Sequence, residues 1–140
     1  MTRKGPSRSA DAQFGGGRLD IAKAFLKAAR TAAESVDAND VANPAVSLIV
    51  HAAIAYTDAL TAKVAGYVNT QDHTAASKAL RAALRDRLPN EQERRLVRIL
   101  GEKAEAEYGV RPLRGSDAVR LLRDLEKFVS WAEGELARSR

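Results

Sequence analysis

Apolar residues recur every three to four positions along most of the chain, which is the period of an α-helix with one buried face. This pattern predicts helices over residues 19–35, 43–67, 73–87 and 91–108. It also predicts a last helix, capped by Ser116 or Asp117, whose apolar stripe runs from Ala118 to Leu136. No segment shows the sustained alternation of apolar and polar residues that is typical of a half-buried strand. The chain is therefore predicted to be all-α, an up-and-down bundle of about five helices.

The segment over residues 43–67 differs from the others because nearly every position after Ala45 is apolar. A helix that is apolar on all sides is usually buried on most of them. Pro44 is compatible with a helix start, because the N–H groups of the first turn have no helical partner. Many of the residues are alanine, which lets neighbouring backbones approach closely. We expect this helix to lie at the centre of the bundle.

The length of 140 residues suits one domain with a core that needs neither disulfides nor metal ions. Residues 1–17 are polar, basic and glycine-rich, so we expect a mobile tail followed by a helical-bundle domain over residues 18–140. The absence of cysteine excludes thiol catalysis, disulfides and Cys-ligated zinc. The two histidines have no carboxylates at regular ligand spacing, and the glycines at 15–17 follow no strand, so we expect neither a metal nor a cofactor.

The sequence favours a cytoplasmic protein that does not bind a membrane. No uninterrupted apolar run reaches the ~18–20 residues of a membrane span. The basic N-terminal residues are followed by polar residues and glycines rather than by the apolar core of a signal peptide. The lack of cysteine also suits a reducing compartment.

The formal net charge is +5 and the isoelectric point about 9.8, which suggests an anionic partner. The positive charge is concentrated in residues 1–18 and 79–98, and each stretch carries a net charge of +3. The second stretch contains five candidate phosphate-binding or RNA-binding residues, Arg81, Arg85, Arg94, Arg95 and Arg98. The alternative is a solvated helix face, because Glu91 and Glu93 interrupt the run and no aromatic residues are interleaved for base stacking.

Four polar residues of the central helix, Ser47, His51, Asp58 and Thr61, fall within a sector of roughly 80°. One interpretation is a relay from His51 to Asp58 that faces a cleft, with His51 as a general base. The other, which we prefer, is a polar seam whose groups hydrogen-bond to a neighbouring helix. His51 and Asp58 are two helical turns apart, which is far for a direct hydrogen bond. Asp72 is expected to cap the third helix, beside His73.

The order of these features resembles the HEPN superfamily, small helical-bundle proteins of nucleic-acid defence and toxin–antitoxin systems. The resemblance covers about residues 19–138, in the segments LDIAKAFLKAAR, AVSLIVHAAIAYTDAL, QDHTAASKAL, EAEYG and SDAVRLLRDLEKFVSWAEGEL. It implies a bundle that commonly forms a homodimer, with RNA cleavage or nucleotide binding in many members. It also implies a cognate protein partner, such as a nucleotidyltransferase-like antitoxin.

Catalytic members of that superfamily typically carry, before the last helix, an arginine and a histidine separated by four to six residues. No arginine stands at that spacing before His51 or His73, and the nearest match places Lys103 before Tyr108. Tyrosine is a poor general base at neutral pH, because its ordinary pKa is near 10. We therefore expect a non-catalytic HEPN-like module that binds RNA or a partner protein. The alternatives are a ribonuclease-type toxin with an atypical site, and a purely structural or regulatory protein. The candidate catalytic residues of that atypical site are His51, Asp58, Lys103 and Tyr108.

Overall fold

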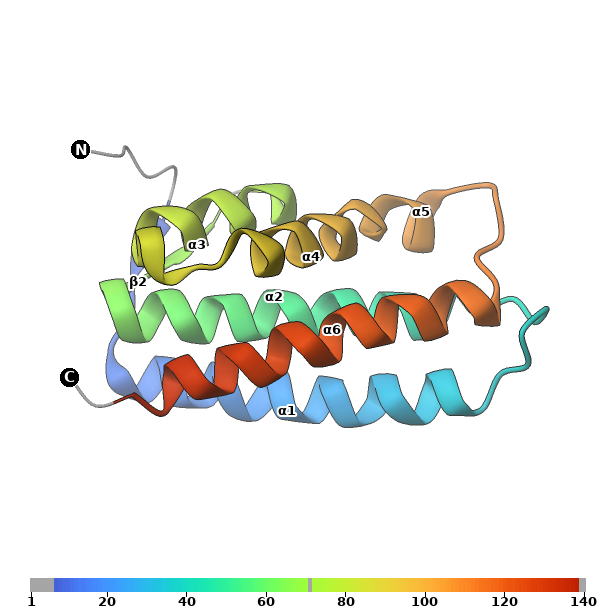
Figure 1. The fold of residues 1–140 in the computed structure, drawn as a ribbon, viewed down its shortest axis with the longest axis horizontal. Helices are drawn as coiled ribbons and strands as arrows, with labels where there is room; N and C mark the ends of the chain where they lie inside the picture. Colours follow the sequence, from blue (N-terminus) through green and yellow to red (C-terminus); the bar gives the residue numbers. More distant parts are fainter. Residues whose placement is uncertain (1–6, 71, 139–140) are drawn as a thin grey trace.

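The computed structural model describes residues 7–70 and 72–138 and confirms the all-α bundle. Its helices are α1 (Ala12–Glu34), α2 (Asn43–Ala65), α3 (Ala76–Leu84), α4 (Asn90–Gly101), α5 (Lys103–Tyr108) and α6 (Gly115–Leu136), shown in Figure 1. Short 3₁₀ turns, η1 (His73–Ala75) and η2 (Arg85–Arg87), precede and follow α3. The helix predicted over residues 91–108 is divided at Glu102 into α4 and α5.

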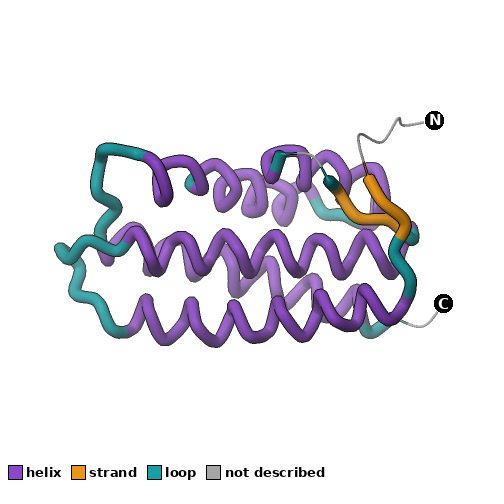
Figure 2. The backbone as a smooth tube through the Cα atoms, turned by 180° about the vertical axis from the view of Figure 1, so that it is seen from behind, coloured by secondary structure: helices purple, strands orange, loops and turns teal. Residues whose placement is uncertain are grey.

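Helix α2 occupies the centre of the bundle, as predicted. It lies between α1 on one side and α3, α4 and α5 on the other, and α6 runs alongside it (Figures 1 and 2). Its largest fully buried side chains are Tyr56, Ile49 and Leu60, which pack in the same core as Phe128 of α6. By length and composition alone α2 could also cross a membrane, but 72% of its most apolar window is buried inside the bundle. A core helix accounts for that pattern.

Part of the segment predicted as a tail, residues 1–17, has regular secondary structure within the described residues. Residues Ser7–Ser9 form strand β1, and α1 begins at Ala12, where Asp11 caps it by accepting a hydrogen bond from the Phe14 N–H at 2.8 Å. The three glycines are helical despite their low helix propensity, because this part of α1 packs on α2. A methyl group on Gly15 would lie 3.3 Å from the Ala62 side chain. Residues 1–6 lie outside the described residues.

The structure contains a short two-stranded ribbon that the sequence does not predict. Helix α2 ends at Gly66, whose φ of 73° is the left-handed conformation that favours glycine, so the helix stops two residues earlier than predicted. Strand β2 (Tyr67–Asn69) follows and pairs antiparallel with β1, with Ser9 opposite Tyr67. Strands of three residues are too short to show an alternating pattern.

The opposite end of the bundle carries the loops over residues 35–42 and 109–114, which we call the loop end. The two loops are joined by backbone hydrogen bonds, from Ala42 N to Leu113 O at 2.7 Å and from Gly115 N to Asp40 O at 2.9 Å. The Asn43 side chain adds a donor bond to Ala106 O at 3.1 Å and accepts one from Leu113 N at 2.9 Å. The start of α6 is therefore fixed against the start of α2.

Candidate functional site

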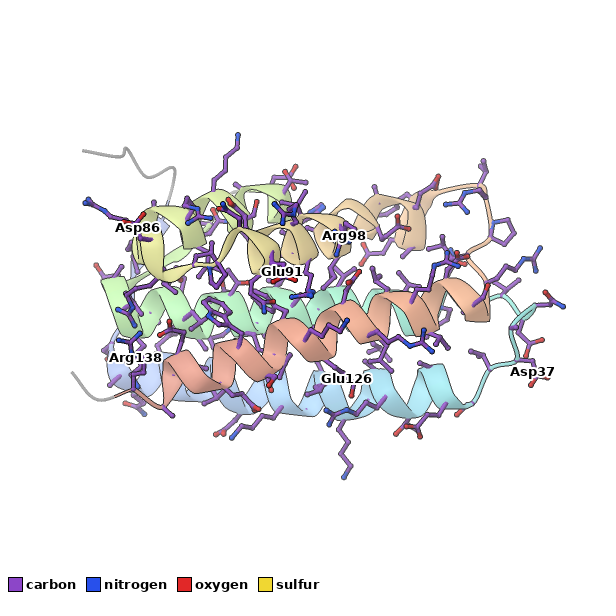
Figure 3. All side chains as sticks on the ribbon, in the orientation of Figure 1. Asp37, Asp86, Glu91, Arg98, Glu126 and Arg138 are labelled. Carbon is purple, nitrogen blue, oxygen red and sulfur yellow. The ribbon has the colours of Figure 1, made fainter. Side chains whose placement is uncertain are left out.

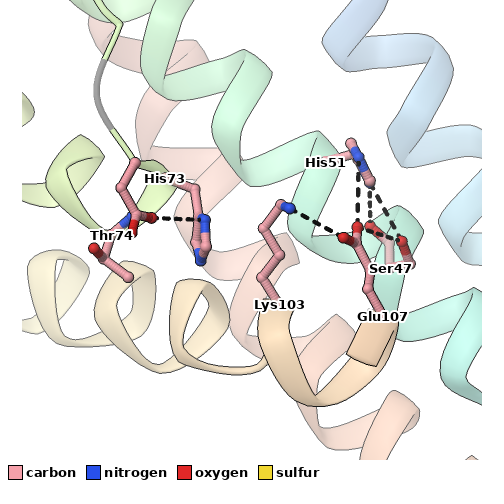
Figure 4. Close-up of polar contacts among 7 residues, drawn as sticks. Ser47, His51, His73, Thr74, Lys103 and Glu107 are labelled. Carbon is pink, nitrogen blue, oxygen red and sulfur yellow. Dashed lines mark hydrogen bonds and ion pairs between the residues drawn. The ribbon is translucent and has the colours of Figure 1, made fainter. Parts of the chain in front are cut away.

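Helix α5 brings two of the predicted site residues, His51 and Lys103, into one cluster through Glu107 (Figure 4). Lys103 and Glu107 are one helical turn apart, and Lys103 Nζ lies 3.1 Å from Glu107 Oε2. The other carboxylate oxygen of Glu107 accepts a hydrogen bond from Ser47 Oγ at 3.4 Å and lies 4.0 Å from His51 Nε2. This cluster joins α5 to the first half of α2.

One nitrogen of the His51 ring is held by a hydrogen bond to the backbone, and the other can accept a proton. Its Nδ1 lies 2.7 Å from the backbone carbonyl of Ser47, which can only accept, so Nδ1 carries a proton. In the neutral ring Nε2 then holds the lone pair, on the side that faces Glu107. The ring stacks on Phe25 of α1 with its centroid 5.3 Å away, and the side chain is 40% exposed. His51 is thus held in one orientation with a proton acceptor open to solvent.

The second histidine, His73, pairs with Asp72, whose carboxylate is also influenced by the charge of Lys103. Asp72 caps the η1 turn, as predicted for the start of the third helix, by accepting from the Thr74 N–H at 3.1 Å, and its carboxylate lies 2.9 Å from His73 Nδ1. The backbone hydrogen bond from Thr74 lowers the pKa of Asp72, to which His73 and Lys103 contribute. The hydrogen bond from Lys103 likewise lowers the pKa of Glu107. Both carboxylates are therefore ionised at neutral pH.

Asp58 does not join this cluster. Its carboxylate lies 3.2 Å from Arg18 Nη2 of α1, and burial raises its pKa to about 6 although Arg18 opposes the shift. Asp58 and His51 are seven residues apart on one helix, so their backbones are separated by roughly 10 Å. The predicted polar sector therefore divides into Ser47 and His51, which contact Glu107 of α5, and Asp58, which pairs with Arg18 of α1.

Tyr108 also lies outside the cluster. It is the last residue of α5, and it is 80% exposed. Sequence reasoning missed Glu107, although its spacing of four residues from Lys103 is the usual signal of an ion pair on a helix. It also missed Arg18, for which no local pattern exists. Among the described residues, no group of three or more His, Asp or Glu side chains is placed to hold a metal ion.

Three of the five candidate arginines are held by internal partners. Arg81 joins α3 to α4 by donating to Glu93 at 2.7 Å and to the Leu88 carbonyl at 2.9 Å. Arg95 pairs with Glu91, as its spacing predicts, and Arg98 donates twice to Asp124 of α6, at 3.1 and 3.2 Å. The other two, Arg85 and Arg94, are exposed, and no ion pair holds either side chain within the described part of the chain. The predicted basic patch therefore has fewer unpaired positive charges than the sequence suggests.

An open groove of about 650 Å³ lies between α4 and α6, on the face that carries Arg98 (Figure 3). Its floor includes Val46 and Leu121, and its charged walls carry three arginines and three acids, namely Arg98, Arg111, Arg120, Glu102, Asp117 and Asp124. The wall charges cancel, but three exposed cations without ion pairs in the described chain stand on the same two helices. They are Arg94 on α4, and Arg123 and Lys127 on α6. The two helices that form the groove therefore carry unpaired positive charge in addition to its balanced walls.

Comparisons with protein-family models and with curated proteins find no match to this sequence. The fold and site define an all-α bundle with a polar histidine cluster and a separate charged groove.

Proposed function

We propose that this protein is a HEPN-like helical module that binds RNA along the α4–α6 groove and acts as a homodimer. The observation that carries RNA binding is the presence of unpaired cations, Arg94, Arg123 and Lys127, on the two helices that form a groove with arginines in its walls. Guanidinium groups match the geometry of phosphate oxygens and release counterions when they bind them. These three side chains can contact phosphates without breaking an internal ion pair.

The paired arginines contribute in a different way. Asp124 holds Arg98 and Asp117 holds Arg120, which donates to it at 2.5 Å, so both guanidinium groups are fixed in the walls. Each keeps N–H groups that its acid does not use. Their charge is already neutralised, however, and we therefore expect the unpaired cations to determine the salt dependence of RNA binding.

The test measures binding of a fluorescently labelled RNA by anisotropy at salt concentrations from low to physiological. The variant Arg94→Gln/Arg123→Gln removes one unpaired cation from each of the two groove helices, α4 and α6. The matched control Lys23→Gln/Lys27→Gln removes two exposed cations from α1, on the other side of the bundle from α4 (Figure 1). We expect the groove variant to lower affinity about tenfold or more and to reduce the slope of log K against log salt by roughly 1.4, and the control to change neither.

Equal losses in the two variants would show that RNA binds by net charge rather than at the groove. No binding at low salt would refute RNA as the ligand and leave a partner protein or a structural role. Under the non-catalytic proposal, purified protein leaves the RNA intact.

The polar cluster supports a second candidate function, a ribonuclease with an atypical site. His51 Nε2 would take the proton of the RNA 2′-hydroxyl as its oxygen attacks the phosphorus, and Lys103 would stabilise charge on the phosphate. The P–O5′ bond would break, and the leaving 5′-oxygen would take a proton from water. The geometry that favours this candidate is the fixed His51 ring within one ion-pair network with Lys103. Cleavage that is lost in His51→Gln and Lys103→Met but kept in Tyr108→Phe would establish it. Cleavage that survives in His51→Gln would exclude this cluster as its site.

A further inference from the structure

We propose that the loop end is the surface on which a second copy of this chain docks, across a two-fold axis. This inference rests on the homodimer part of the proposed function and does not depend on RNA binding. It follows from three properties of the loop end, which are exposed apolar side chains, a rigid backbone and charges of opposite sign on its two loops.

Large apolar side chains gather at the loop end without being covered. Val110 is 100% exposed, Tyr108 80% and Val41 55%. The other exposed large apolar residues of the described chain, Ile21, Val97 and Val119, lie on the outer faces of three different helices. A concentrated group of exposed apolar residues is typical of a protein contact, and tyrosine is a frequent anchor in such contacts.

Backbone hydrogen bonds join the first loop to residues 113–116, at the end of the second loop and the start of α6. Besides the bonds from Ala42 to Leu113 and from Gly115 to Asp40, Ser116 N donates to Ala38 O at 3.1 Å. The packing is close, since a methyl group on Gly115 would collide with the Asp37 carbonyl oxygen. A surface that is already ordered loses little conformational entropy when it binds.

The charges of the loop end favour a second copy over a different protein. The loop over residues 35–42 carries Asp37 and Asp40, and the loop over residues 109–114 carries Arg111 and Arg114. Asp37, at the tip of its loop in Figure 3, and Arg111 are both exposed, and neither forms an ion pair within the described chain. A two-fold axis that runs between the two loops places the acidic loop of each copy against the basic loop of the other, twice. In that arrangement the surface is complementary to itself.

The test reverses the charge of Asp37 in one variant and of Arg111 in another, and measures the dimerisation of each by sedimentation equilibrium. In Asp37→Lys and in Arg111→Glu, like charges meet at both symmetric contacts, and we expect each variant alone to dimerise at least about tenfold more weakly than the wild type. In an equal mixture of the two variants, both contacts of the mixed dimer are again attractive. We expect the mixture to recover the wild-type affinity. Only contact between two copies of this surface predicts that recovery.

Two further variants complete the test. Val110→Asp introduces charge at the apolar centre and should weaken association in every combination, whereas Asp20→Lys, on the exposed face of α1, should not. A wild type that stays monomeric at all concentrations would overturn the proposal, as would a mixture no better than its components. Asp37 lies outside the α4–α6 groove, so the Asp37→Lys variant should still bind RNA if the groove proposal is right. The two proposals can therefore fail separately.

Discussion

The Asp58 carboxyl should make the stability of this protein depend on pH between pH 5 and 7. Its side chain is 16% exposed and is enclosed between α1 and α2, with Arg18 Nη2 at 3.2 Å. Burial raises its pKa from the ordinary 3.8 to about 6, because removal from water disfavours the charged form more than Arg18 favours it. The folded protein therefore binds this proton more tightly than the unfolded chain does.

The sign and size of the effect follow from linkage. Protonation of Asp58 stabilises the fold fully below the unfolded pKa of 3.8, and this stabilisation is lost as pH rises through about 6. The difference between the two pKa values corresponds to about 3 kcal/mol in total, of which about 1.3 kcal/mol is gained between pH 7 and pH 5. Asp72, Glu107 and Asp117 have lowered pKa values. Their contributions are lost as pH falls through their ordinary pKa values of 3.8 to 4.5 and below, so the loss begins at the acidic edge of this window.

The assay is urea unfolding at pH 5, 6 and 7, followed by the fluorescence of Trp131, the one tryptophan, which packs on the buried Phe128. The free energy of unfolding of the wild type minus that of Asp58→Asn should rise by about 1.3 kcal/mol from pH 7 to pH 5. Subtracting the variant removes the contributions of all other groups. Asp20→Asn, at an exposed position of α1, should give a flat difference. A flat difference for Asp58→Asn as well would refute the argument from burial. In Arg18→Met the transition should move to higher pH, because the opposing cation is gone.

Three other substitutions test the packing with the same unfolding assay. Gly16→Ala should stabilise the protein by about 0.5–1 kcal/mol, because the position is helical and a methyl group there meets no atom within 4 Å. Gly115→Ala should destabilise it by about 1–3 kcal/mol, because the methyl group would collide with the Asp37 carbonyl, and an equal effect of the two changes would contradict this reasoning. Tyr56→Phe should cost about 1 kcal/mol, because the buried hydroxyl donates to Glu133 at 3.3 Å and the pKa of Tyr56 is raised to about 12, chiefly by burial. A Tyr56→Phe variant as stable as the wild type would show that this hydrogen bond contributes nothing net.

The helical pattern of the sequence predicted the fold because burial in this bundle follows local periodicity. The apolar stripe expected from Ala118 to Leu136 is largely the buried face of α6, and the apolar segment after Ala45 is the central helix. The errors lie where contacts between distant residues decide the structure. Helix propensity argues against a helix through three glycines, but packing of α1 on α2 stabilises one there. The β1–β2 ribbon likewise depends on a pairing across about sixty residues.

The candidate site could be predicted only in part, for a related reason. Sequence spacing shows which residues share a helix face, but not which helix that face meets. It grouped His51 with Asp58, whereas the structure pairs Asp58 with Arg18 and His51 with Glu107. Counting charges likewise gave a basic patch around Arg98, since its partner Asp124 is 26 residues away in the chain. Arg94, Arg123 and Lys127 could be recognised as unpaired only after the internal ion pairs of the other arginines were known.

The Asn43 amide also has a consequence for the order in which the chain folds. It binds Ala106 and Leu113, which are 63 and 70 residues further along, so its hydrogen bonds close a loop of half the chain. Closing such a loop costs entropy that only a largely assembled bundle repays. We therefore expect these bonds to form after the rate-limiting step, so that an Asn43→Ala variant unfolds faster but folds at nearly the wild-type rate. Asn43 is therefore expected to affect the unfolding rate of the protein more than its folding rate.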